Sequence, residues 1–185
     1  MLENRECKFV IIGGGPAGTQ CALTLHRWGL DVTVISRPLP HCPNAQIPNL
    51  SDKNRSTVEI ARENIIEFRK RNIRTVTGSV RAIKIIPRTG FQVTVDNGTV
   101  DATHVILATG SPRADGTLDL SELEELEFDS DGRIITSSDY ETGHCGLFAI
   151  GEAAADYVRT LSCALGTGDG VARMLAKRHW KPLAA

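Results

Sequence analysis

The chain has 185 residues and a formal net charge of −1, with 21 Lys and Arg against 22 Asp and Glu. This length allows one domain with a sizeable core. The balanced charges exclude the basic footprint of a nucleic-acid-binding protein and give no membrane-surface patch. Because residues 1–6 are charged and form no signal-peptide core, and no apolar run could span a bilayer, we expect a cytoplasmic protein.

Five cysteines are scattered along the chain, and no two of them form a Cys-x-x-Cys pair. The odd count and the wide spacing argue against a secreted disulfide framework and against a zinc site. We therefore expect no metal. The cysteines are Cys7, Cys21, Cys42, Cys145 and Cys163.

The N-terminal third predicts a strand, a helix and a second strand. Residues 8–12 are an apolar run typical of a buried parallel strand. Pro16 suits the first turn of a helix that runs to about Trp28, and Gly29 can end it. Residues 32–35 predict the next strand, which completes a βαβ unit.

A Gly-x-Gly-x-x-Gly motif lies at the turn between the first strand and the first helix. Gly13 allows the tight turn, Gly15 lets the backbone approach a pyrophosphate, and Gly18 lets the helix pack close to the strand. The phosphates would rest on free N–H groups at the helix N-terminus. The motif does not separate FAD from NAD(P), and a glycine-rich turn without a ligand is the structural alternative.

The middle of the chain predicts an irregular segment, a helix and more strands. Residues 37–55 contain four prolines and predict a long loop. Ser56 and Glu59 form a capping box for a helix to about Arg71, and residues 73–76 predict a third strand.

A β-meander is expected after that strand. Residues 80–86 and 91–95 predict antiparallel strands, and the turn at 96–98 leads towards an apolar strand at 105–107. The meander would cover one face of the parallel sheet.

The last third predicts a connector, a strand and a terminal helix. Ala108-Thr109-Gly110 ends the strand before it, and a polar, acidic connector follows over 111–131. Residues 147–150 predict the final strand, which ends at Gly151-Glu152. A helix is expected over 160–178.

Three strand ends followed by glycine, at 13–18, 108–110 and 148–152, occur in an order that resembles the thioredoxin reductase-like, FAD-dependent pyridine nucleotide-disulfide oxidoreductases. The spacing from Gly151 through Arg159-Thr160-Leu161 to Gly166-Thr167-Gly168 also matches that family. The resemblance implies a Rossmann-like α/β fold, a three-layer ββα arrangement with a central parallel sheet and a β-meander. It also implies FAD as cofactor.

The resemblance assigns roles to individual residues. The first motif would hold the FAD pyrophosphate, the Ala-Thr-Gly segment would lie near the flavin nucleotide, and Glu152 would reach the ribityl chain. The backbone near Thr160 and Leu161 would face the flavin pyrimidine edge, where a helix N-terminus favours negative charge. The cofactor-binding residues implied in this way are Gly13, Gly15, Pro16, Ala17, Gly18, Ser36, Arg37, Val80, Ala108, Thr109, Gly110, Gly151, Glu152, Arg159, Thr160 and Leu161.

Departures from the family pattern shape the expected function. The chain lacks a second Gly-x-Gly-x-x-Gly and a Cys-x-x-Cys, and a nucleotide domain of roughly 100 residues does not fit in 111–131. We expect a single FAD-binding domain over 1–185, with this connector where the family inserts its NADPH domain. Ser36 stands where an acidic residue usually binds ribose, Glu152 replaces an Asp, and Arg37 keeps NADP binding open through a 2′-phosphate.

The function expected is that of an FAD-dependent oxidoreductase enzyme that passes electrons between an external donor and an acceptor. The donor or acceptor can be a protein, and a homodimer is a further possibility. Two alternatives remain open: a subunit whose partner provides the NAD(P)H or dithiol function, and a non-catalytic nucleotide-binding module. The catalytic residue is unknown; Cys42, beside His41, is the candidate, and a loop cysteine without a role is the alternative.

Overall fold

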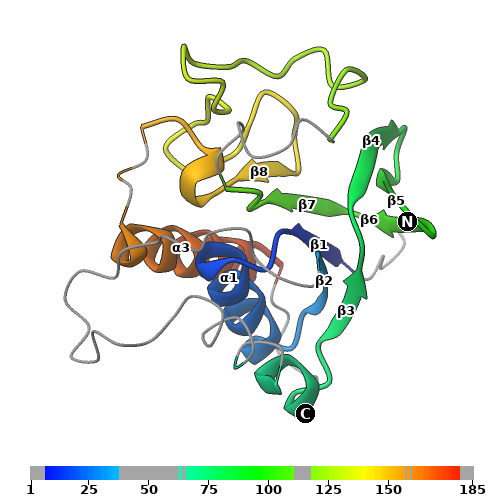
Figure 1. The fold of residues 1–185 in the computed structure, drawn as a ribbon, viewed down its shortest axis with the longest axis vertical. Helices are drawn as coiled ribbons and strands as arrows, with labels where there is room; N and C mark the ends of the chain where they lie inside the picture. Colours follow the sequence, from blue (N-terminus) through cyan, green and yellow to red (C-terminus); the bar gives the residue numbers. More distant parts are fainter. Residues whose placement is uncertain are drawn as a thin grey trace.

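The computed structural model describes residues 7–37, 63, 66–110, 118–156, 158 and 160–179. A five-stranded parallel sheet has the order β3-β2-β1-β7-β8, and a three-stranded antiparallel sheet has the order β4-β5-β6 (Figure 1). The central strands are β1 (Lys8–Ile12), β2 (Asp31–Ser36), β3 (Arg74–Thr77), β7 (His104–Leu107) and β8 (Leu147–Ala149). The other elements are α1 (Pro16–Arg27), β4 (Val80–Ile86), β5 (Gly90–Val95), β6 (Gly98–Ala102), the 3-10 turn η2 (Gly151–Ala153) and α3 (Leu161–His179). The α/β fold with a meander is therefore confirmed.

The central strands are apolar on both sides because both faces of the sheet are covered. In β1, Phe9 and Ile11 face one hydrophobic cluster, and Val10 and Ile12 face another. Successive side chains of a strand point to opposite faces, so each strand contributes to both clusters. This explains the continuous apolar runs in the sequence.

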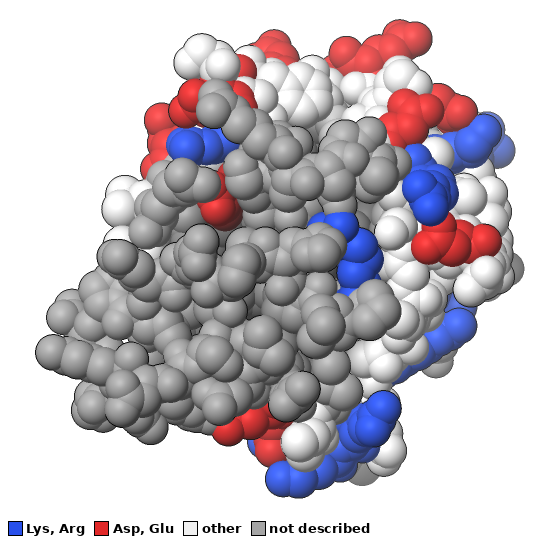
Figure 2. Space-filling view, in the orientation of Figure 1, with Lys and Arg blue, Asp and Glu red and all other residues white. Residues whose placement is uncertain are grey.

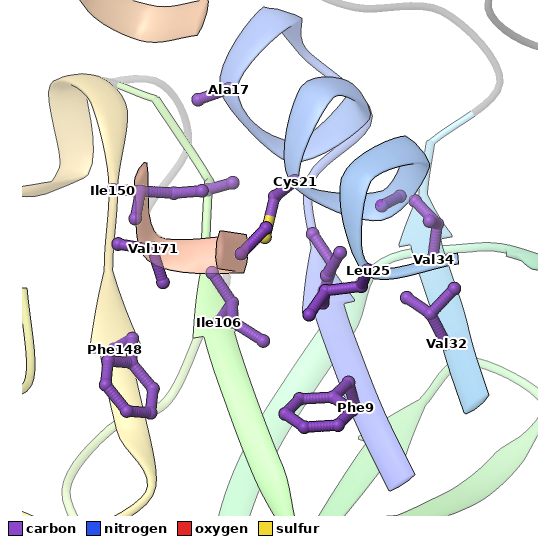
Figure 3. Packing of buried hydrophobic residues seen from close by; sticks show 14 of the residues in the cluster. Phe9, Ala17, Cys21, Leu25, Val32, Val34, Ile106, Phe148, Ile150 and Val171 are labelled. Carbon is purple, nitrogen blue, oxygen red and sulfur yellow. The ribbon is translucent and has the colours of Figure 1, made fainter. Parts of the chain in front are cut away.

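The first cluster lies between the sheet and the helices α1 and α3. Cys21 and Leu25 of α1, both fully buried, point towards the strands, and Val171 of α3 meets Ile106 of β7 from the same side (Figure 3). The helices approach each other closely at Gly168, where an added Cβ would lie 2.2 Å from the backbone oxygen of Ala17. The close approach fixes α3 against α1 and thereby positions α3 beside the N-terminal part of α1.

Two glycines of α3 give a matched test of this contact. Gly168→Ala is expected to destabilise the fold by about 1–3 kcal/mol, because the methyl meets backbone and forces the helices apart. Gly170→Ala should instead stabilise it by roughly 0.5–1 kcal/mol, since its Cβ would meet no described atom and alanine favours the helix. Urea unfolding of both variants measures the difference. Equal stabilities would contradict the tight α1–α3 contact.

The second cluster lies between the other face of the sheet and the meander. Ile83 of β4 and Val93 of β5 are fully buried there. The sequence predicted that the turn at 96–98 is followed by the strand at 105–107. The structure has a further strand, β6, between them. Most of β6 is exposed, so it lacks the apolar alternation by which a strand is recognised in a sequence.

The described part of the acidic connector, from residue 118, packs on the meander rather than standing away from it. Leu123 is buried, and Leu118, Leu120 and Leu126 pack against the second cluster. The glutamates between these leucines face outwards, so the connector is polar in composition yet anchored by its apolar positions. The exposed apolar face that a partner subunit would require is therefore not formed by these leucines.

Other predicted elements are confirmed within the described residues. Residues 66–70 are helical, whereas the capping box at Ser56 and Glu59 lies outside the described residues. No helix in the described ranges is both long and apolar enough to cross a membrane. In Figure 2, Lys and Arg alternate with Asp and Glu over the visible described surface, as the balanced composition suggests.

Candidate dinucleotide-binding site

The glycine loop between β1 and α1 is shaped by close contacts at three of its glycines. Gly13 has φ +115°, and an added Cβ would lie 2.1 Å from the Ala108 carbonyl oxygen. A Cβ at Gly18 would lie 2.0 Å from the Gly13 oxygen, and one at Gly14 would lie 2.7 Å from the Ser36 Oγ. Only glycine fits this geometry, so the loop is held tightly against β7 and β2.

Gly15 differs from its neighbours. A Cβ there would meet no described atom within 4 Å, and the backbone has an ordinary φ of −71°. Neither packing nor conformation therefore requires glycine within the described structure. Gly15 is the N-cap of α1, and no described side chain caps this helix end. The loop thus presents an open backbone surface and the N–H groups of the first helical turn, around Pro16 and Ala17, which together suit an anion.

The end of β7 lies directly beside the loop. The Ala108 N–H donates to the Ile12 oxygen at 2.8 Å, which fixes Ala108 next to the end of β1. Thr109 is exposed and Gly110 is partly exposed. The Ala-Thr-Gly segment therefore lies at the carboxyl edge of the sheet beside the glycine loop, where ligands bind in open α/β sheets.

The end of β8 reaches the same edge. Gly151 packs against Ala17, where an added Cβ would lie 2.9 Å from the Ala17 Cβ, and its N–H donates to the Thr167 Oγ1 at 3.2 Å. Glu152 follows in the 3-10 turn and is partly exposed. The turn therefore places Glu152 at the same edge, next to the start of α1.

The start of α3 completes the edge. The Thr160 Oγ1 accepts from the Cys163 N–H at 3.1 Å and so caps the helix by its side chain. As in any helix, the N–H groups of the first turn, which begins at Leu161, have no carbonyl partner within the helix. Arg159 lies outside the described residues.

The remaining predicted residues fall into two groups. Ser36, at the end of β2, contacts Gly14, and its hydroxyl donates to the Arg37 oxygen at 3.1 Å. Both residues are partly exposed beside the glycine loop. Val80 is 6% exposed and belongs to the second hydrophobic cluster, so its side chain serves packing.

Of the described cysteines, Cys163 is the one whose position in the first turn of α3 brings it to this edge. Burial, reinforced by the charge of Asp169, raises the pKa of the Cys21 thiol far above its usual range. Cys163 is partly exposed in the first turn of α3, and Cys145 is exposed and precedes β8. Cys42, the candidate named from the sequence, lies outside the described residues.

A polar network behind the glycine loop is a feature that sequence reasoning missed. The Thr24 hydroxyl donates to the Asp169 Oδ1 at 2.7 Å, and Gln20 Nε2 lies 3.4 Å from the same oxygen. Burial raises the pKa of Asp169, but hydrogen bonds from Arg173, Thr24 and Gln20 outweigh this and hold it below its usual value. The network ties α1 to α3, and residues 145 positions apart carry no local sequence signal.

The geometry fits an extended, phosphate-containing ligand. The open backbone at Gly15 with a helix N-terminus suits a pyrophosphate, and the three other strand ends line the same edge. The backbone groups and the Ser36, Thr109 and Glu152 side chains placed at this edge do not themselves carry electrons, and Cys163 is the one described thiol beside them. The residues supply binding and positioning, and redox chemistry would need a cofactor.

Residues 7–122 match the family model for pyridine nucleotide-disulphide oxidoreductases. The fold is similar to the thioredoxin reductase of Streptococcus pyogenes (TM-score 0.76, 18% identity; 92% of this chain and 97% of that chain covered). It is also similar to thioredoxin reductase of Lactococcus lactis (0.77, 14%; 96% and 100%) and to a ferredoxin-flavin thioredoxin reductase of Clostridium acetobutylicum (0.76, 13%; 92% and 97%). At such identities the structures share a fold. No curated protein matches the sequence significantly.

Proposed function

Because the chain belongs to the pyridine nucleotide-disulphide oxidoreductase family, we propose that it is an FAD-binding oxidoreductase that passes electrons between an external donor and an acceptor. The observation that carries this proposal is the contrast within the glycine loop. Gly13, Gly14 and Gly18 are crowded by the fold, whereas a Cβ at Gly15 would meet no described atom within 4 Å. Packing explains three of these glycines, and close approach of a pyrophosphate explains the fourth.

Different residues at the carboxyl edge would bind different parts of the cofactor. The backbone at Gly15, Pro16 and Ala17 would hold the pyrophosphate on the α1 N-terminus. Ser36 and Arg37 lie at the end of β2, where they would face the adenosine with one hydroxyl and one cation. Ala108-Thr109-Gly110 would lie along the nucleotide.

The flavin end of the site would be held by β8 and α3. Glu152 would accept hydrogen bonds from the ribityl hydroxyls, and the backbone at Thr160 and Leu161 would face the pyrimidine edge. The N-terminus of α3 would stabilise negative charge beside it. Bound flavin supplies the electron transfer itself, so the chain's own task is to bind, to orient and to set this electrostatic environment.

The short segment between β7 and β8 supports an external electron donor. Only residues 108–146 lie between the two strands, and in the described residues 118–146 they form turns and isolated bridges packed on the meander. A nucleotide domain of roughly 100 residues does not fit there. We propose that this connector stands in place of the family's NADPH domain and that the donor is external. The name of the Clostridium acetobutylicum relative, a ferredoxin-flavin thioredoxin reductase, includes a ferredoxin, and this supports a small redox protein as the kind of donor to test.

Turnover measurements test the enzymatic part of the proposal. The protein reconstituted with FAD is reduced chemically without oxygen and then mixed with artificial electron acceptors such as ferricyanide. Rapid reoxidation, followed by repeated cycles with excess reductant above the uncatalysed rate, is expected. Tightly bound flavin that neither accepts nor passes on electrons would instead identify a non-catalytic nucleotide-binding module.

Glu152→Ala is expected to weaken FAD binding by about 1.5–3 kcal/mol, or roughly 10- to 150-fold in Kd. The reason is the loss of charge-assisted hydrogen bonds to the ribityl chain. Titration of FAD into the variant by fluorescence measures the constant, with Glu124→Ala as a control because Glu124 is exposed on the connector. An unchanged Kd would show that Glu152 does not contact the cofactor.

A further inference from the structure

Three metal-ligating side chains lie together where β1 and β7 begin and α3 ends. Cys7 precedes β1, His104 is the first residue of β7, and His179 is the last residue of α3. Each offers one ligand atom, and the three atoms lie within 4.8 Å of one another. The Cys7 Sγ and the His179 Nδ1 are 3.3 Å apart. Three segments that are distant in the sequence thus bring a thiol and two imidazoles to one point.

This cluster is separate from the candidate dinucleotide site. The glycine loop follows the carboxyl end of β1, whereas Cys7 precedes its amino end, so six residue steps of about 3.3 Å, or roughly 20 Å, separate Cys7 from Gly13. In Figure 3, Phe9 and Phe148 lie at the opposite end of the packed layer from Ala17, which belongs to the glycine loop. Loss of one site therefore need not disturb the other.

A hydrogen bond orients His104 for coordination. The Thr103 Oγ1 lies 3.0 Å from the Lys8 oxygen and 2.9 Å from His104 Nδ1, and it accepts from the Lys8 N–H at 2.9 Å. In the tautomer in which Nδ1 donates to this oxygen, Nε2 keeps the lone pair. Metal-bound histidines typically have such an outer-shell partner on the other ring nitrogen.

Neighbouring rings and charges are compatible with a bound cation. Phe9 stacks on His104 with ring centroids 4.8 Å apart. The nearby cation of Arg178 is paired with Asp139 at 3.0 Å and Glu141 at 3.5 Å. The carboxylates offset its charge.

We propose that Cys7, His104 and His179 bind one zinc ion. Tetrahedral zinc with bonds of about 2.0–2.3 Å holds its ligand atoms roughly 3.3–3.8 Å apart. The Cys7–His179 pair already has this separation, and rotation of these partly exposed side chains brings His104 in. One thiolate and two imidazoles suit zinc rather than magnesium or calcium, and water takes the fourth position.

Zinc binding would join the C-terminal end of α3 to the amino edge of the sheet. The Cys7 thiol loses its proton to the solvent as the Zn–S bond forms, and no oxidant or reductant is needed. The ion would link residues 172 positions apart. Because it binds the folded chain, it should raise the unfolding temperature.

Metal titration tests the proposal directly. The protein is stripped with a chelator, titrated with Co²⁺ under reducing conditions, and then titrated with Zn²⁺. One equivalent of Co²⁺ should give thiolate-to-cobalt charge-transfer absorption, and Zn²⁺ should displace it and raise Tm. Absence of one-to-one binding at micromolar metal would overturn the proposal.

Variants locate the ion. Removal of a residue that only supports a metal ligand typically weakens metal binding by roughly 10- to 100-fold. We expect a larger loss of metal affinity when a ligand itself is replaced, in Cys7→Ser, His104→Gln or His179→Gln. Cys145→Ser and His144→Gln are matched controls, because Cys145 is exposed and His144 lies near Glu125 instead. Metal binding that survives all three cluster variants would place the ion elsewhere, for example at His41 and Cys42, and would refute this site. Apo-protein Tm and FAD binding, measured for every variant, separate a lost ligand from a lost fold and keep the result independent of the flavin proposal.

Discussion

Gly15→Val is expected to abolish FAD binding and to leave the fold intact. The valine side chain would occupy the open space in front of the α1 N-terminus, where the pyrophosphate is proposed to lie. Loss of two charge-assisted hydrogen bonds alone costs at least about 3 kcal/mol, which is more than a hundredfold in Kd. Because a Cβ at Gly15 meets no described atom and the φ of −71° suits any residue, the unfolding midpoint should change little.

Gly13→Val is the contrasting variant, since it lies in the same loop but should destroy the fold. Its φ of +115° and the 2.1 Å approach to Ala108 leave no room for a side chain. Circular dichroism and FAD titration of both variants distinguish the two effects. A Gly15→Val protein that binds FAD as tightly as the unaltered chain would show that the pyrophosphate lies elsewhere.

NADPH and NADH are expected to reduce the bound flavin slowly. The chain has no second dinucleotide motif and no Cys-x-x-Cys, so no dedicated surface would hold the nicotinamide against the flavin. Positioning of two reactants can lower a barrier by roughly 7–11 kcal/mol, and most of that advantage would be missing. Chemical reductants and protein donors should be faster because they do not depend on such a surface.

Anaerobic stopped-flow mixing with each nucleotide measures the bleaching of the flavin. A slow rate that rises linearly with nucleotide concentration is expected. Rapid, saturable bleaching would contradict an external donor and make the chain a self-sufficient reductase. In that case Arg37→Ala tests whether Arg37 binds the 2′-phosphate of NADPH. If it does, the variant should lose reduction by NADPH and keep reduction by NADH.

The fold could be predicted from the sequence wherever a local pattern carries the information. The apolar run at 8–12 and the glycine spacing after it predicted β1, the turn and α1, because strand alternation and close packing leave direct marks on residue type. β6 was missed because its side chains are mostly exposed, so its pairing with β5 is decided by the backbone. The connector appeared polar because its glutamates outnumber the leucines that anchor it.

The parts of the site that depend on long-range contacts could not be predicted from the sequence. The predicted strand ends converge at the carboxyl edge, because parallel strands must end on the same side. The bond between Thr24 and Asp169 and the cluster of Cys7, His104 and His179 join segments with no local relation. The expectation of no metal rested on the number and spacing of the cysteines in the sequence, and it stays a prediction; the zinc proposal comes from a cluster that only the fold brings together.

The absorption spectrum of the purified protein, incubated with FAD and freed of excess by gel filtration, tests the central proposal most directly. One FAD per chain should co-elute with the protein and show the two flavin bands, with shifts that report a protein environment. A colourless protein fraction, with all of the FAD recovered in the small-molecule volume, would contradict the assignment of the carboxyl edge as a flavin site.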